Sequence, residues 1–246
     1  MAKQKGIVFF EGTLGGINFY YRKGVPTARR AGGGFNAKAI KTSPKMVRVR
    51  ESNSEFALCS TINKHFKRAL KPFLLGYKDG TLHARLMRLF LSLKDLDVTS
   101  VRGKRKVGVG YATAYGPRLL SDFKVTPERP RLFDADYSFD WDALQLEVSN
   151  FSIASAQYPV GADTMEVMVG VLRFDFDTCT YDSVMADRVF IDRDFGATTF
   201  TIAVDGLPEG AGVLVAVARV AFYQRVNDRL FLLPGSAGFG VEMFSC

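Results

Sequence analysis

Two stretches in the first half of the chain repeat apolar residues at intervals of three and four. The first stretch carries Phe56, Cys59, Ile62, Phe66, Leu70 and Phe73, and the second carries Leu82, Leu86, Leu89, Leu93 and Leu96. This spacing places the apolar side chains on one face of a helix. We expect the first helix to begin near Ser52 or Ser54, because residues 46–50 alternate like a strand, and to end or bend at Pro72. The short connection between the two stretches predicts an antiparallel helical hairpin.

Residues 6–30 have the pattern of a β-hairpin or a short β-meander. Two apolar runs, at residues 6–10 and 17–21, flank the Gly-rich turn at 12–16, where glycine supplies the positive φ of a tight turn. Two or three strands are only marginally stable alone, so we expect the hairpin to dock its apolar face on the rest of the chain or on a neighbouring subunit. The glycines at 32–34 predict a flexible joint.

From Phe133 onward the apolar residues alternate with polar ones, which is typical of half-buried strands. The alternation begins at residues 137–148, and further strands are expected at 165–177, 187–192, 198–204, 213–225, 229–233 and near 241. About seven strands within roughly 110 residues favour an immunoglobulin-like antiparallel β-sandwich, with a jelly roll as the alternative.

The expected fold class is therefore α+β. We predict a hairpin and helical module at residues 1–130 and a β-sandwich domain at residues 131–246. The segment from Pro127 to Pro130 marks the predicted boundary.

The net charge of +8 conceals a difference between the two halves. Residues 1–131 hold 27 Lys and Arg against 8 Asp and Glu, whereas residues 132–246 hold 6 against 17. Such a field attracts either a polyanion such as nucleic acid or the acidic half of another copy of the chain. Both interpretations favour binding over catalysis. The alternative is that these cations only keep the helix faces solvated and bind no partner.

Twelve cations are the predicted contacts to a polyanion or to a neighbouring subunit. They are Arg22, Lys23, Arg29, Arg30, Lys64, Lys67, Arg68, Lys71, Arg102, Lys104, Arg105 and Lys106. Aromatic residues such as Tyr20 and Tyr21 are interleaved with the first of them, and such groups can stack bases while the cations position phosphates. Alternatively, the aromatics pack the hairpin onto the helices and the cations contact an acidic neighbour.

The sequence contains no recognisable catalytic or metal-binding motif. Its two histidines, His65 and His83, lie in basic helical stretches without the context of a triad, and its three cysteines are far apart. The acidic run at 175–182 lacks the glycine and the closing Glu of a calcium loop, and the Gly-rich stretch at 108–110 lacks the third glycine of a dinucleotide fingerprint. We expect no enzyme activity, no cofactor, no metal and no small-molecule substrate.

The location of the protein is predicted from the same absences. No run of 18 uncharged apolar residues is present, and the N-terminal apolar stretch is too short for a secretory signal. Isolated cysteines suit reduced thiols. We expect no membrane association and a place in the cytoplasm, or in a particle assembled there.

Several segments together resemble a family of small proteins from Bacteroidota. They are residues 3–16, Phe19 and Tyr20, Arg29 and Arg30, residues 48–56 and residues 99–105. In that family a Gly-rich basic hairpin and helices precede a β-rich C-terminal domain. The resemblance implies this layout and brings no activity with it.

These observations predict a non-enzymatic structural or scaffold protein that assembles with itself into a homo-oligomer. A phage-like or particle component is one form of this hypothesis. The alternative is a nucleic-acid-binding protein whose basic half grips the phosphate backbone. An enzyme of unfamiliar type is the third and weakest hypothesis.

Overall fold

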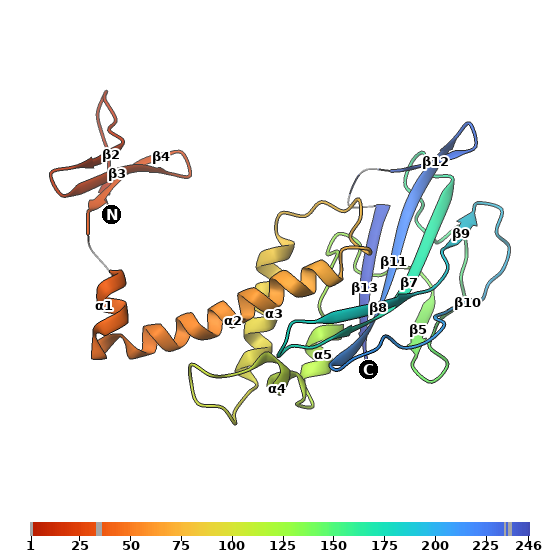
Figure 1. Ribbon diagram of the computed structural model, residues 1–246. Coiled ribbons are helices and arrows are strands. Elements are labelled where there is room, and N and C mark those ends of the chain that lie inside the picture. Colours follow the sequence, from red (N-terminus) through yellow and green to blue (C-terminus); the bar gives the residue numbers. More distant parts are fainter. Residues whose placement is uncertain (1, 33–35, 234, 236–237) are drawn as a thin grey trace. The chain divides into compact units, whose positions relative to one another are not determined.

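The computed structural model describes residues 2–32, 36–233, 235 and 238–246 of the chain (Figure 1). The fold is α+β, with helices and several antiparallel sheets. The chain divides into two compact units, Met1–Asn53 and Ser54–Cys246. This division does not coincide with the predicted boundary between residues 130 and 131. Residues 33 and 34 of the predicted glycine joint lie outside the described residues.

The first unit contains a small antiparallel sheet, which we call the ribbon. Its strands are β1 (Ala2–Lys3), β2 (Gly12–Leu14), β3 (Ile17–Arg22) and β4 (Val25–Arg30), in the order β1-β4-β3-β2. Two-residue turns, Gly15–Gly16 and Lys23–Gly24, connect β2 to β3 and β3 to β4, and all four of these residues have positive φ. Such turns match the twist of antiparallel strands. The predicted meander is therefore present only in part. Residues 17–21 pair with β4 in a sheet of four strands, but the predicted strand at 6–10 is irregular, and the predicted turn at 12–16 contains β2 and narrows to Gly15–Gly16.

Short helical segments follow the ribbon. The helix α1 (Ala37–Thr42) begins where the Asn36 side chain accepts a hydrogen bond of 2.6 Å from the Ala39 amide. The 3-10 turn η1 (Pro44–Met46) has proline at its start and leads directly into α2 (Val47–Ala69). Helix α2 thus begins earlier than the predicted Ser52 or Ser54, because the proline-initiated turn already sets helical geometry at Val47.

Three more helices precede the sheets of the second unit. Helix α3 (Leu82–Asp95) buries Leu82, Leu86, Leu89 and Leu93, as their spacing predicts. The basic Gly-rich stretch after it forms the short helices α4 (Val107–Tyr111) and α5 (Gly116–Ser121).

Two antiparallel sheets complete the second unit. The larger, six-stranded sheet centres on β7 (Thr164–Phe174) and β11 (Val213–Val226). Its other strands are β8 (Tyr181–Met185) and β9 (Val189–Asp192), which pair with β7, and β12 (Arg229–Leu232) and β13 (Phe239–Ser245), which pair with β11. The smaller sheet has the order β10-β6-β5, from β10 (Phe200–Ala203), β6 (Gln145–Ser149) and β5 (Asp136–Asp140).

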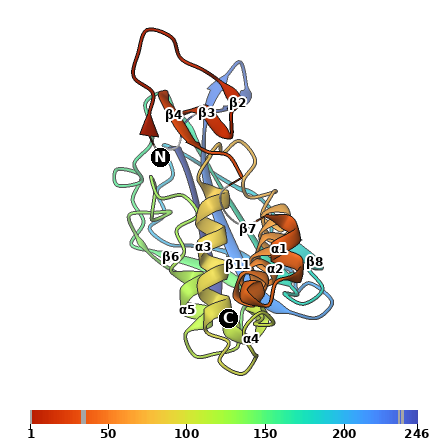
Figure 2. The same ribbon diagram turned by 90° about the vertical axis from the view of Figure 1, so that its left-hand side faces the viewer.

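The second unit is layered, with helices on one face of the larger sheet and the smaller sheet on the other. Alternate residues of β7 enter two apolar cores: Met168 and Leu172 pack with the helices, whereas Val167 and Val171 pack with the smaller sheet. Figure 2 shows α2 and α3 in front of β7 and β11. The basic helices and the acidic sheets therefore share a core and fold together.

Because the helices and the sheets belong to one unit, the charge is distributed differently from the two predicted halves. The second unit, residues 54–246, holds 22 Lys and Arg against 23 Asp and Glu, so its net charge is close to zero. The first unit, residues 1–53, holds 11 against 2. The excess positive charge of the chain is thus carried by the first unit, while the second is polarised between its helical and its sheet layers.

Candidate functional site

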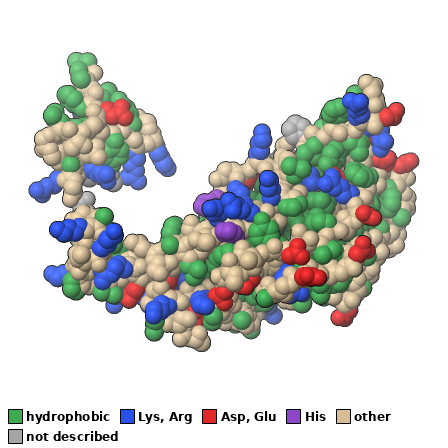
Figure 3. All heavy atoms as spheres, in the orientation of Figure 1, with side chains coloured by type: hydrophobic (Ala, Val, Ile, Leu, Met, Phe, Trp, Pro, Cys, Tyr) green, Lys and Arg blue, Asp and Glu red, His purple; other side chains and the backbone are tan. Residues whose placement is uncertain are grey.

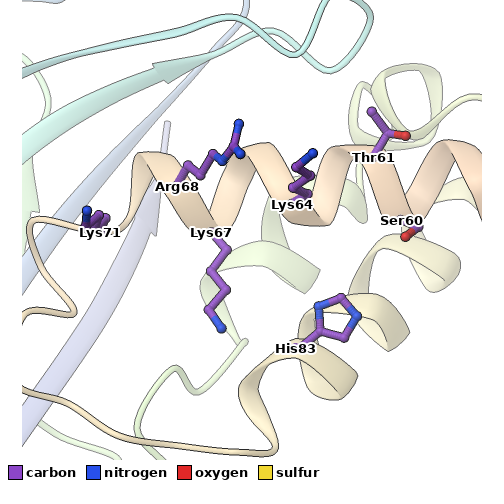
Figure 4. Close-up of a pocket in the computed structure, with 7 residues that line it drawn as sticks. All are labelled: Ser60, Thr61, Lys64, Lys67, Arg68, Lys71 and His83. Atoms are coloured by element: carbon purple, nitrogen blue, oxygen red, sulfur yellow. The ribbon is translucent and has the colours of Figure 1, made fainter.

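A hollow of about 530 Å³ lies over α2 and the beginning of α3 in the second unit. We call it the basic groove, and its lining residues are Ser60, Thr61, Lys64, Lys67, Arg68, Lys71 and His83 (Figure 4). Figure 4 shows Lys67 directed toward the start of α3, where His83 lies, while Lys64 and Arg68 leave α2 on its other side. Figure 3 shows Lys and Arg side chains gathered beside histidine on this face.

The four cations of the basic groove are those predicted on the first helix. They recur at intervals of three and four residues and are exposed, apart from the aliphatic stems that line the hollow. Among the described residues, none of the four forms an ion pair. Like charges at these intervals destabilise a helix by about 0.2–0.5 kcal/mol per pair. The groove therefore carries a positive charge that a bound anion would compensate.

The nearby acidic side chains are engaged elsewhere. Asp79 forms an ion pair of 2.5 Å with Arg85, and Asp95 lies 2.5 Å from Lys94. Glu55 on α2 is buried and bonded to other cations. No carboxylate close in sequence is thus available to the cations of the groove.

Asn63 holds His83 in place at the end of the groove. The buried Asn63 side chain donates through Nδ2 to the His83 carbonyl at 2.9 Å and lies 3.3 Å from His83 Nδ1. The carbonyl fixes the orientation of the amide, and an amide nitrogen only donates, so His83 Nδ1 accepts. The proton of the neutral ring is then on Nε2, which can donate to a ligand.

The cations at 102–106 have different surroundings from those of the groove. Arg105 donates to both carboxylate oxygens of Glu55, and Lys106 pairs with Asp177 at 3.0 Å. Asp97 also accepts from the backbone amides of Thr99, Ser100 and Lys106. These bonds hold the loop against α2, so Arg105 in particular acts as a structural residue. Arg102 and Lys104 are exposed.

The remaining predicted cations lie on the ribbon of the first unit. Arg22, Lys23, Arg29 and Arg30 are all exposed, and the Arg29 guanidinium lies 5.4 Å from the centre of the Tyr20 ring. This distance is within the range of a cation–π contact. Tyr20 thus serves at least in part to position an arginine.

The ribbon also exposes large apolar side chains. They are Ile7, Val8, Phe9, Phe10, Leu14, Ile17, Tyr21 and Val25. Within residues 2–32, only Thr27 is buried. The ribbon is therefore a single layer without a core of its own.

One group of polar residues was not anticipated from the sequence. Glu166 on β7 and Arg219 on β11 are buried side by side, with Glu166 Oε1 and Arg219 Nη1 3.7 Å apart, and the Tyr223 hydroxyl donates to Glu166. The signal that could have revealed the pair is an arginine within the apolar run of residues 213–222.

The described part of the chain offers neither a cluster of metal ligands nor a helix that could span a membrane. Its residues include no group of three or more His, Cys, Asp or Glu side chains able to hold a metal ion. None of its helices combines the length and the apolar character needed to cross a lipid bilayer.

Comparisons with known proteins do not assign a family to the chain. Neither protein-family models, nor curated proteins, nor solved structures gave a match.

Proposed function

We propose that the protein is a non-enzymatic structural or scaffold protein that assembles with copies of itself, in the manner of a phage-like or other particle component. The observation that carries this proposal is the ribbon, a sheet that buries only Thr27 and exposes a continuous apolar segment at residues 7–10. An antiparallel sheet gains stability by packing one face on a second layer. A neighbouring subunit supplies that layer in this proposal.

Charge complementarity favours another copy of the chain as the partner. The ribbon belongs to a unit with 11 Lys and Arg against 2 Asp and Glu. In the second unit, the outward face of β5 and β6 exposes Asp136 and Glu147 beside a shallow hollow of about 380 Å³. We therefore propose that the ribbon of one subunit docks on the β5–β6 face of the next. Such a heterologous contact closes into rings or continues as filaments.

Light scattering after size exclusion tests this contact. The wild-type chain should form an oligomer at 0.1 M salt that weakens at 1 M salt, because salt screens exposed charges. Replacing Arg22, Lys23, Arg29 and Arg30 together with Ser should leave a monomer. A wild-type monomer at all concentrations, or an undiminished oligomer of the fourfold variant, would contradict the proposal.

A mixing experiment identifies the face that receives the ribbon. The double variant Asp136→Asn, Glu147→Gln should also be monomeric alone. Mixed with the fourfold ribbon variant, it should form a heterodimer, since one chain keeps its ribbon and the other keeps its acidic face. The matched control Asp205→Asn, Glu209→Gln removes two exposed carboxylates from a loop and should still assemble.

We also propose an immunoglobulin-like arrangement for the two sheets. Their antiparallel pairing and their shared apolar core support it. The helices that cover the opposite face of the larger sheet are an addition to a free-standing sandwich. Two Greek-key motifs in eight strands would instead indicate a jelly roll.

The same proposal places the chain in the cytoplasm, or in a particle assembled there. Cys59, Cys179 and Cys246 are free thiols, which suits a reducing compartment. Cell fractionation followed by immunoblotting tests this location.

A further inference from the structure

We infer that the basic groove is a binding site for the phosphodiester backbone of nucleic acid. The site lies within the second unit and is separate from the ribbon in sequence. It therefore does not depend on the proposed self-assembly.

The chemistry of the lining residues is that of an anion site. Every polar lining group is a cation or can donate a hydrogen bond: three lysines, one arginine, two hydroxyls and the imidazole of His83. The absence of a carboxylate from the lining favours a ligand with several negative charges.

The spacing of the cations suits a chain of phosphates. Lys64 and Arg68 are four residues apart on α2, as are Lys67 and Lys71, and four residues of an α-helix rise about 6 Å. This separation is comparable to that of successive phosphates along a nucleic-acid strand. The two pairs lie side by side along the helix. One phosphate can therefore contact Lys64 and Lys67, and the next phosphate can contact Arg68 and Lys71.

The lining argues against a protein partner for this groove. Protein interfaces centre on large aromatic and apolar anchors, whereas the only aromatic ring in the lining is the imidazole of His83 and no Leu, Ile, Val, Met, Phe, Tyr or Trp lines the groove. Apart from that one ring, the groove gives bases no stacking surface. Binding should therefore be independent of base sequence and strongly dependent on salt.

Fluorescence anisotropy with the full-length protein tests the inference. The probes are two fluorescein-labelled 20-nucleotide DNA strands of unrelated sequence, titrated between about 0.05 and 0.3 M salt, a range where phosphate contacts dominate affinity. We expect equal affinity for the two strands. The double variant Lys67→Gln, Lys71→Gln should bind more weakly, and its slope of log affinity against log salt should be smaller by about 1.4, since each phosphate contact to a single strand contributes about 0.7.

A matched control variant distinguishes binding in the groove from attraction by the net charge of the protein. Lys78→Gln, Arg118→Gln removes two exposed cations of the second unit that lie outside the groove and are not among the predicted contacts. Its affinity and salt slope should equal those of the wild type. All four replaced residues are exposed, so both variants should keep the wild-type melting temperature. An equal loss of affinity in the two variants would show that overall charge attracts the DNA, and it would overturn the inference that the groove is the binding site.

Two further measurements complete the test. The comparison is repeated in the fourfold ribbon variant, where the effect of Lys67 and Lys71 should persist because the groove is in the other unit. Polyglutamate is then added as a competitor, and it should displace the DNA only weakly. No binding by the wild-type chain, or displacement by polyglutamate at a concentration of charge equal to that of DNA, would overturn the inference, the second outcome in favour of an acidic protein surface.

Discussion

Arg105 and Glu55 form a bidentate ion pair across 50 residues of sequence, with Nε 2.8 Å from Oε1 and Nη2 2.7 Å from Oε2. The Glu55 carboxylate also accepts from Lys94 Nζ at 2.9 Å and from the Gly103 amide at 2.7 Å. Its side chain is 4% exposed. One carboxylate thus ties α2 to α3 and to the loop that follows α3.

The bonds to Glu55 predict a specific dependence of stability on pH. The hydrogen bonds from Arg105, with those from Lys94, lower the pKa of Glu55 from 4.5 to about 2 against the effect of burial. A pKa that is lower in the folded state contributes stability above about pH 4.5, and this contribution is lost as the pH falls toward 2. The shift corresponds to about 3 kcal/mol. Glu55→Gln should therefore lose about 3 kcal/mol at pH 7 and less at pH 3.

Urea unfolding at several pH values, followed by Trp141 fluorescence, measures this effect. The free energy of unfolding should fall more steeply between pH 5 and pH 3 in the wild type than in Glu55→Gln. Some slope should remain in the variant, because hydrogen bonds also lower the pKa values of Asp79 and Asp97. Equal slopes in the two proteins would contradict the assigned role of Glu55.

Two glycines of α4 should respond differently to replacement by alanine. A Cβ at Gly110 would lie 1.8 Å from the Leu93 carbonyl oxygen, whereas a Cβ at Gly108 would meet only Phe176 Cβ, at 3.4 Å. Gly110→Ala should cost about 2 kcal/mol of stability because backbone must move. Gly108→Ala should be neutral or stabilising by up to about 1 kcal/mol, since alanine favours a helix. Thermal unfolding of the two variants distinguishes them, and equal effects would argue against the close approach of α4 to α3.

Much of the fold was predictable from local periodicity. The interval pattern predicted α3, and alternation with β-branched residues predicted strands close to β7 and β11. The edge strand β8 was missed because its residues are only partly buried and show no clear alternation. Phe56 fits the helical spacing yet is 55% exposed. Periodicity indicates which face a residue occupies, and it does not indicate where the covering layer ends.

The site was predictable only in part, for a related reason. The four cations of the basic groove lie on one helix, so their spacing alone brings them together. His83 joins them through the packing of α3, and Asn63 positions it through a bond across 20 residues. Arg105 has the same local signal as the groove cations, but its partner Glu55 is 50 residues away. A partner this far away in sequence cannot be recognised from local patterns, so the sequence does not reveal that Arg105 has a structural role.

The three cysteines should differ in reactivity. Cys246 is exposed, whereas Cys59 and Cys179 are buried. Burial also raises the pKa of Cys59 to about 11 and raises that of Cys179, so neither is readily ionised at pH 8. A chromogenic disulfide reagent should rapidly modify one thiol per native chain and three per chain in denaturant. Cys246→Ser should abolish the rapid reaction, and a rapid reaction that remains would contradict the burial of the other two.

The buried pair of Glu166 and Arg219 should show strong energetic coupling. Glu166 Oε1 and Arg219 Nε have no hydrogen-bond partner among the described residues. Arg219 pairs with Glu166 at 3.7 Å, whereas Glu166 also lies 3.6 Å from Nη1 of the half-exposed Arg188. Glu166→Met alone should cost about 3 kcal/mol or more, because Arg219 is left buried and unpaired, and Arg219→Met should cost less, because Arg188 still faces Glu166. The double variant should cost well below the sum, with a coupling energy of about 2 kcal/mol.

A second double-mutant cycle provides the contrast for this prediction. Arg225 and Asp192 are 2.8 Å apart, closer than the buried pair, yet both side chains are nearly half exposed. Their coupling energy should be below about 1 kcal/mol, because water screens the charges and solvates whichever partner remains. Burial, and not distance, should thus decide which pair matters more for stability. Equal coupling energies in the two cycles would show that water reaches Glu166 and Arg219 within the larger sheet.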